Sequence, residues 1–129
     1  MSLCVGGVAN NYSVTSDASG YFTATTGLPD GSYNWKLKGQ LNLAGSGTLT
    51  LAGNTSSMEM GTQRAGDATG DNLVSAQDFT ILKNSFGKSV GQPGYDGRSD
   101  FNRDSLVSST DFSLLKGNFG QGGASLTCP

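Results

Sequence analysis

A duplicated acidic segment in the C-terminal half is the feature that most constrains the fold. Residues 67–87 and 100–120 are related by an offset of 33 residues and are identical at eleven of 21 aligned positions. Each copy starts with an acidic, turn-rich stretch and continues with apolar residues at helical spacing. Two repeats of this size indicate one structural unit duplicated, each copy burying its apolar face against the other.

Each copy begins with a loop, 67–78 or 100–111, that carries side-chain oxygens at loop positions 1, 3, 5, 9 and 12. A hard cation with six to eight oxygen ligands needs this spacing, because a tightly wound loop turns alternate side chains inward and the seventh residue offers its carbonyl oxygen. The predicted ligands are Asp67, Thr69, Asp71, Leu73, Ser75 and Asp78 in the first loop, and Asp100, Asn102, Asp104, Leu106, Ser108 and Asp111 in the second.

Charge and ligand type favour two Ca²⁺ ions. Six of the ten carboxylates lie at these positions, three per loop, and they would repel one another without a cation. Mg²⁺ is the weaker candidate because it demands a tight octahedron and dehydrates reluctantly. We expect calcium to be needed to fold this half, and the two sites to differ in affinity because Thr69 stands where the second loop has Asn102. The alternative is a pair of solvated acidic turns that cap helices.

The apolar residues after each loop predict one short helix per repeat, beginning near the last Asp and ending at Gly87 or Gly120. Residues 88–99 are rich in Gly and Pro and are predicted to be a linker. Apolar residues at i, i+3 and i+7 give the predicted core, which is Phe79, Leu82, Phe86, Phe112, Leu115 and Phe119.

The N-terminal half has the pattern of β-structure. Strand-forming runs at 12–14, 21–26, 33–38, 48–51 and 58–60 alternate with Gly-, Asp- and Pro-containing turns. The predicted fold class is therefore α+β in two modules. A small antiparallel β-sandwich, residues 1–62, is followed by a pair of calcium loop–helix (F-hand) repeats, residues 63–129.

A duplicated calcium loop with one following helix, and without the helix that precedes the loop of an EF-hand, resembles the type I dockerin domain. The resemblance covers residues 66–120 and rests on Asp at loop position 12, Leu-Val at positions 7 and 8, and the Phe-x-x-Leu-Lys that follows. It implies docking onto a cohesin domain, possible in two orientations, in an extracellular, cellulosome-like assembly, with polysaccharide association through the parent protein. The implied contact residues are Ala76, Gln77, Lys83 and Asn84 in the first repeat, and Ser109, Thr110, Lys116 and Gly117 in the second.

The N-terminal half resembles a carboxypeptidase-regulatory or prealbumin-like β-sandwich more loosely, through its segments 15–22 and 28–33. This resemblance implies a companion module that orients or stabilises the dockerin-like part. At some 60 residues it is short for that fold, so a strand is expected to be missing.

Composition argues against several other classes of partner. A net charge of −2 without a basic patch argues against nucleic acid, and no apolar run approaches the roughly 20 residues of a membrane span. No signal-peptide pattern is visible. Residues 1–3 look foreign to the native chain, so we expect a native leader or upstream domain to have been removed.

Cys4 and Cys128 stand at opposite ends of the chain, and a bridge between them would close nearly all of it into one loop. We favour the bridge over two free thiols because small exported domains often use disulfides.

We expect no enzyme, because His is absent and the clustered carboxylates are assigned to metal. Three alternatives remain: an isopeptide bond between Glu59 and Lys36 or Lys38, carbohydrate stacking on Trp35 with Tyr12, Tyr21 or Tyr33, and a calcium-stabilised structural or adhesin module of a secreted protein.

Overall fold

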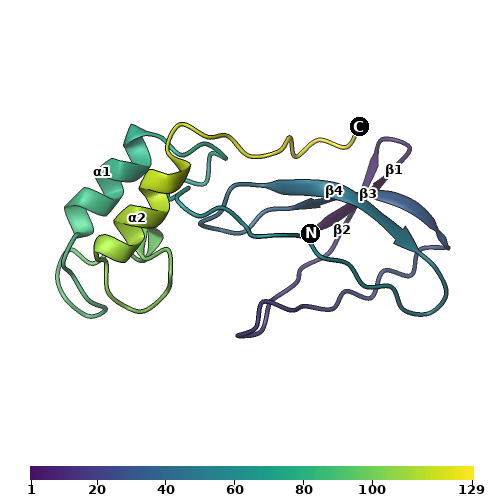
Figure 1. Ribbon diagram of the computed structural model, residues 1–129, viewed down its shortest axis with the longest axis horizontal. Coiled ribbons are helices and arrows are strands. Elements are labelled where there is room, and N and C mark those ends of the chain that lie inside the picture. Colours follow the sequence, from purple (N-terminus) through teal and green to yellow (C-terminus); the bar gives the residue numbers. More distant parts are fainter. The chain divides into compact units, whose positions relative to one another are not determined.

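The computed structural model describes residues 1–129, which form an α+β structure with one antiparallel sheet and two α-helices (Figure 1). The chain divides into two compact units. The sheet unit comprises residues 1–37, 45–61 and 125–129, and the loop–helix unit comprises residues 38–44 and 62–124.

The sheet contains β1 (Ser2–Val5), β2 (Val8–Asn11), β3 (Gly31–Leu37) and β4 (Gly45–Leu51), in the order β2-β1-β3-β4 with all neighbours antiparallel. Gly6 and Gly7 have φ of 55° and 79° and form the turn of the β1–β2 hairpin. A two-residue hairpin turn with positive φ at both positions favours glycine, because the missing Cβ removes the steric penalty.

The predictions for the N-terminal half were only partly right. Strands form at 31–37 and 45–51, near two of the predicted runs, whereas residues 12–14, 21–26 and 58–60 are not strands. The structure has one sheet instead of the two of a sandwich. A strand forms only where a neighbouring strand provides hydrogen-bond partners, and these three segments have no such neighbour despite their alternating sequence. They are irregular chain, and Tyr12, Met58 and Met60 pack against the core of the sheet unit.

The core of the sheet unit is built around Leu3, Tyr33 and Trp35, which are all buried. Leu3, in the segment expected to be foreign, lies in β1 and is fully buried. A Cβ at Gly47, the β4 partner of Trp35, would lie 2.8 Å from the indole Nε1, so this glycine leaves room for the ring.

The loop–helix unit contains α1 (Ala76–Ser85), η1 (Gly97–Ser99) and α2 (Ser109–Asn118). Both α-helices begin with a capping box. The Ser side chain accepts a hydrogen bond from the first turn, and the Asp three residues later accepts one from the Ser backbone. The helices end where Gly87 and Gly120 adopt φ of 75° and 79°, the left-handed conformation predicted for them. The segment 88–99 contains no α-helix, only the short η1.

Each loop is completed by the segment that follows the other repeat's helix. Val74 in the first loop exchanges backbone hydrogen bonds with Gly120 and Gln121 after α2, at 2.8 and 2.9 Å. Val107 in the second loop makes the same exchange with Gly87 and Lys88 after α1, at 2.8 and 3.0 Å. Because this pairing is reciprocal, neither repeat can complete its own hydrogen bonding alone.

The predicted core of this unit needs correction. Leu82 and Leu115 are buried, but Phe79 and Phe112 are 38% and 37% exposed. Phe86 and Phe119 are about half exposed, because they are the C-cap residues, with ψ of 133°, and their side chains leave the helical face. The remaining core positions are filled from other segments: Leu41, Leu43, Ala65, Ala68, Val74, Phe101 and Val107.

Candidate metal centre and interaction surface

The second acidic loop brings three carboxylates together. Oxygen atoms of Asp100, Asp104 and Asp111 all lie within 4.8 Å of one another, and the group could hold a metal ion. Asp100 and Asp111 are buried, whereas Asp104 is exposed. The cluster therefore consists of two buried carboxylates and one exposed carboxylate.

Backbone N–H groups hold the two buried carboxylates of this loop in place. Asp111 accepts hydrogen bonds from the N–H of Phe101 at 2.7 Å and of Ser108 at 2.8 Å, one on each oxygen. Asp100 accepts from Asp104 at 3.1 Å and Ser105 at 2.9 Å, again one on each oxygen. Such bonds orient the carboxylates before any ligand arrives.

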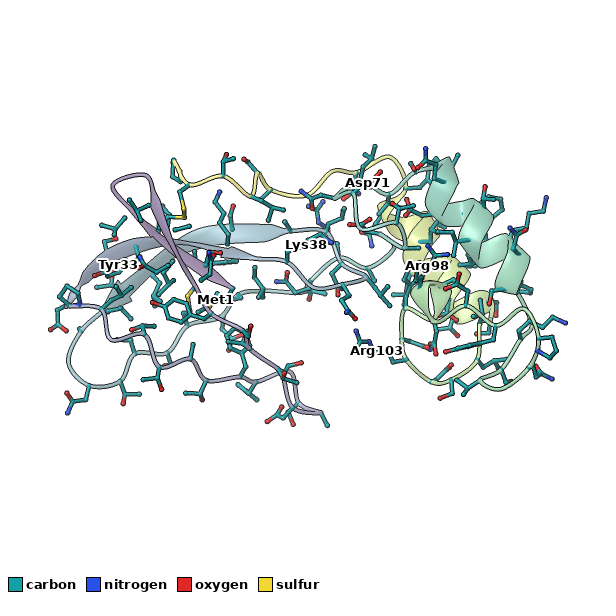
Figure 2. All side chains as sticks on the ribbon, turned by 180° about the vertical axis from the view of Figure 1, so that it is seen from behind. Met1, Tyr33, Lys38, Asp71, Arg98 and Arg103 are labelled. Atoms are coloured by element: carbon teal, nitrogen blue, oxygen red, sulfur yellow. A yellow bond between two sulfur atoms is a disulfide. The ribbon has the colours of Figure 1, made fainter.

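The first loop is built similarly around its first and last Asp, but its three carboxylates do not form a comparable cluster. The Thr69 hydroxyl lies 3.4 Å from Oδ1 of Asp67 and 3.0 Å from Oδ1 of Asp78, so these three predicted ligands converge. Asp67 and Asp78 are fully buried. Asp71, labelled in Figure 2, is exposed, and its Oδ1 accepts the N–H of Leu73 at 2.9 Å.

The residue at loop position 6 has a left-handed backbone in both repeats, a conformation that favours glycine or asparagine. Asn72 has φ of 68° and Ser105 has φ of 72°. Both N–H groups donate to Oδ2 of the first Asp of their loop, at 2.9 Å in each case. The strained turn thus aims a donor at the first predicted ligand in both repeats.

A divalent cation fits this donor set. The chain has two side-chain ion pairs, Lys38–Asp67 and Arg98–Asp96, so the buried carboxylates of Asp100 and Asp111 have no basic partner. Buried carboxylates without a counter-charge are costly unless a metal compensates them. A cavity of about 540 Å³, lined in part by Thr69 and Asp100, gives solvent access to both loops.

Two residues outside the predicted ligand set touch the first Asp of each loop. The Lys38 ammonium lies 2.8 Å from Oδ2 of Asp67, and the Tyr95 hydroxyl donates to Oδ2 of Asp100 at 2.8 Å. The hydrogen bond to Asp100 raises the pKa of the Tyr95 hydroxyl above its usual value, with burial and the neighbouring carboxylates acting in the same direction. No sequence motif marks Lys38, which lies 29 residues before its partner.

The second ion pair lies beside the second loop. Arg98 donates to Asp96 through its Nε and its Nη2, the latter at 2.7 Å. This hydrogen bonding lowers the pKa of the Asp96 carboxyl and raises that of the Arg98 guanidinium. Asp96 also caps η1 by accepting the Arg98 N–H at 3.0 Å. The Asp96 carboxylate therefore pairs with Arg98 and caps η1, and it is not one of the predicted metal ligands.

The eight predicted contact residues are all exposed. Ala76 and Gln77 open α1, and Ser109 and Thr110 open α2. The other four occupy the later part of the same helices, as Lys83, Asn84, Lys116 and Gly117. Their role in binding stays a prediction.

Phe79 and Phe112, which were predicted to lie in the core, form a partly exposed pair. The rings of Phe79 and Phe112 lie side by side, one from each helix, with centroids 6.0 Å apart. Each ring belongs to the residue just after the last Asp of its loop, so Phe79 and Phe112 are equivalent positions of the two repeats. This partly exposed aromatic pair adds apolar area to the surface formed by the two helices.

The two loop–helix repeats define a small duplicated domain with one acidic loop and one α-helix in each copy. Residues 65–120 match the family model of the dockerin type I domain. That segment contains both loops, both α-helices and all predicted ligands. No curated protein matches the chain.

Solved structures extend the likeness to most of the chain. A chain from the crystal structure of a type II cohesin–X–dockerin complex of Acetivibrio cellulolyticus, a C-terminal interface mutant, matches with a TM-score of 0.69 and 23% identity. The match covers 95% of this chain and 81% of that one. The N-terminal interface mutant of the same complex gives a TM-score of 0.67, with the same identity and coverage.

A type II cohesin–dockerin structure from Bacteroides cellolosolvens is 32% identical over 46% of this chain and 90% of that chain, with a TM-score of 0.39. The two Acetivibrio matches show a shared fold, and their 95% coverage includes the N-terminal sheet. Neither α-helix has the length and apolar character of a membrane-spanning segment.

Proposed function

We propose that this chain is a calcium-dependent docking module that attaches its parent protein to a cohesin-type domain. The observation that carries the proposal is the dockerin type I match over 65–120, which coincides with the two acidic loops and their helices. The Acetivibrio structures are complexes of a dockerin with a cohesin, which is the partner class proposed here. The expected setting is an extracellular, cellulosome-like assembly.

Two Ca²⁺ ions are proposed, one in each loop, in a pair of F-hand repeats. Each loop would supply its predicted side-chain oxygens and the carbonyl of its Leu, as suits a flexible oxygen cage. Bound calcium supplies the positive charge that the buried carboxylates lack. Because each loop is completed by the other repeat, metal in one loop also steadies the segments paired with it.

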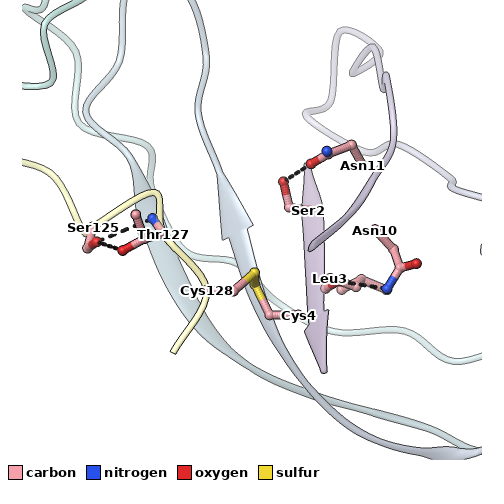
Figure 3. Close-up of a disulfide and its surroundings, with 8 residues drawn as sticks. All are labelled: Ser2, Leu3, Cys4, Asn10, Asn11, Ser125, Thr127 and Cys128. Carbon is pink, nitrogen blue, oxygen red and sulfur yellow. Dashed lines mark hydrogen bonds between the residues drawn. A yellow bond between two sulfur atoms is a disulfide. The ribbon is translucent and has the colours of Figure 1, made fainter. Parts of the chain in front are cut away.

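A two-module arrangement is proposed for the whole chain. The compact units support it, although their bounds differ from the predicted 1–62 and 63–129: the loop–helix unit comprises residues 38–44 and 62–124, and residues 125–129 belong to the sheet unit. The N-terminal unit would act as a companion module, although its single antiparallel sheet differs from the two sheets of a prealbumin-like sandwich. The Cys4–Cys128 disulfide suits an oxidising, extracellular location (Figure 3).

The docking surface is proposed to lie on the exposed faces of α1 and α2. Ser109-Thr110 carries a pair of hydroxyls where the first repeat has Ala76-Gln77. The two orientations allowed by an internal two-fold repeat are therefore unequal, and we expect the second repeat to make the main contact if only one orientation is used.

A binding assay with a panel of type I and type II cohesins, with and without a calcium chelator, tests the function. Binding to at least one cohesin that is lost on chelation and restored by Ca²⁺ supports it. In that complex, Ser109→Asp should weaken binding at least tenfold, because it places a charge in a desolvated contact, while Ala76→Asp should leave it nearly unchanged. Full binding after chelation would remove the calcium-dependent proposal, and the reverse order of the two variants would move the contact to the first repeat.

The structure weakens two alternatives. Trp35 and Tyr33 are only 5% exposed, so they do not offer the stacking surface that carbohydrate binding would need. Lys38 pairs with Asp67 instead of Glu59, which removes one of the two lysines considered for an isopeptide bond. A purely structural calcium-locked module is the remaining alternative. Calcium-dependent folding without binding to any cohesin of the panel would favour it.

A further inference from the structure

The first Asp of each acidic loop is held by a different kind of donor. In both loops the position-6 N–H, from Asn72 or Ser105, donates to Oδ2 of that Asp at 2.9 Å. A second donor reaches the same oxygen at 2.8 Å. It is the charged ammonium of Lys38 in the first loop and the neutral hydroxyl of Tyr95 in the second.

Lys38 is fixed in this position by its other hydrogen bonds. Its Nζ also donates to the carbonyl oxygens of Gly39 at 2.9 Å and Asn42 at 2.7 Å, so all three ammonium protons have partners. The connection that carries Lys38 is anchored by Leu41 and Leu43, which lie in the core of the loop–helix unit. The side chain is 20% exposed and Asp67 is fully buried, so solvent screens this charge only weakly.

No other basic group gives the second loop a positive charge comparable to that of Lys38 in the first loop. Arg98 is paired with Asp96, and Arg103, at position 4 of the second loop, is exposed and has no ion-pair partner. An exposed charge in water contributes little to a nearby site, whereas one in direct contact with a buried ligand contributes more. The first loop thus has an ammonium in contact with one of its carboxylates, whereas the second loop brings three carboxylates together without a contacting ammonium.

We infer that Lys38 is a positioning residue that orients Asp67 and, by its charge, makes the first loop the weaker of the two calcium sites. The inference rests on the proposed calcium function. The ammonium holds Oδ2, whereas Oδ1 accepts the Gly70 N–H at 2.8 Å and lies 3.4 Å from the Thr69 hydroxyl, another proposed ligand, so Oδ1 is the oxygen that would face the metal. Its positive charge also repels an entering cation, so the second loop should fill first, by about three- to tenfold in affinity.

A calcium titration of the intact chain, followed by ¹⁵N–¹H NMR in a buffer with a competing chelator, measures both sites separately. The amide of Asn72 reports on the first loop and that of Ser105 on the second. Lys38→Gln removes the charge and keeps a donor, Lys38→Arg keeps the charge, and Tyr95→Phe removes the neutral donor. Tyr95→Lys places a positive charge beside Asp100 in the second loop. It tests the effect of charge even if the chain does not fold with a substitution at Lys38.

The expected result is that Lys38→Gln tightens the first site about three- to tenfold at low salt, and less at high salt, while Lys38→Arg leaves it near the wild-type value. Tyr95→Lys should weaken the second site, and Tyr95→Phe should change it less. Equal shifts in Lys38→Gln and Lys38→Arg, or a first site that is unchanged or weakened in Lys38→Gln, would overturn the role of charge. Calcium uptake by neither loop of the wild-type chain would instead refute the calcium function itself.

Discussion

Asn72 joins three segments of the loop–helix unit. Its Oδ1 accepts the N–H of Ala44 at 2.7 Å, its Nδ2 donates to the carbonyl oxygen of Ala124 at 3.0 Å, and its own carbonyl oxygen accepts the N–H of Gly123 at 2.9 Å. Gly123 leaves the room for this arrangement, because a Cβ there would lie 2.0 Å from Asn72 Oδ1 and 2.5 Å from the Ala44 nitrogen.

Gly123→Ala should therefore lower the free energy of unfolding by about 1–3 kcal/mol, since the added methyl group forces the Asn72 side chain away from Ala44. Urea unfolding in calcium-containing buffer, followed by helical circular dichroism, measures the loss. Gly122→Ala is the matched control, because a Cβ there would have its nearest contact at 3.8 Å. Equal losses in the two variants would contradict this account.

At the scale of single residues, the spacing of oxygen side chains predicted where the buried carboxylates converge. It did so because loop ligands lie close in sequence and their geometry is local. The contacts of Lys38 with Asp67 and of Asn72 with Ala44 and Ala124 could not be predicted in this way. They join residues that are distant along the chain, and one sequence carries no signal for such pairs.

At the scale of elements, each helix depends on a serine that caps its first turn. Ser108 accepts the N–H of Thr110 at 3.2 Å, while its own N–H donates to Asp111 at 2.8 Å. Ser108→Ala removes the first bond together with a predicted calcium ligand, and should lower the free energy of unfolding by at least about 1 kcal/mol. Thermal unfolding with saturating calcium measures it. Ser109→Ala, one residue along and exposed, should change stability by less than about 0.5 kcal/mol, and a loss as large as that of Ser108→Ala would argue against the cap.

The helices were easier to predict than the strands. Their start and stop signals, a Ser-x-x-Asp box and a terminal glycine, act within a few residues. Strands need partners, and the runs at 21–26 and 58–60 have strand-like composition but no ladder to join. The core assignment failed at Phe86 and Phe119 because the helical period was continued into the C-cap, where the backbone turns away.

At the scale of the whole molecule, two spectroscopic probes report on the two compact units separately. Trp35, the one tryptophan of the chain, is buried in the core of the sheet unit, and both α-helices belong to the loop–helix unit. Tryptophan fluorescence therefore follows the sheet, and helical circular dichroism follows the repeats. The disulfide between Cys4 and Cys128 joins β1 to the C-terminal residues within the sheet unit, with a sequence separation of 124.

Loss of the disulfide and loss of calcium should each lower a different unfolding midpoint, one followed by tryptophan fluorescence and the other by helical circular dichroism. Reduction of the disulfide opens a loop of nearly the whole chain, which on the chain-entropy model is worth up to about 4–5 kcal/mol, and it should lower the fluorescence midpoint most. Chelation of calcium leaves the buried carboxylates uncompensated and should lower the circular-dichroism midpoint most. Thermal scans with reductant, with chelator and with both measure the two effects. If either treatment moved both midpoints by the same amount, the units would unfold as one, and the two-module proposal would have to be abandoned.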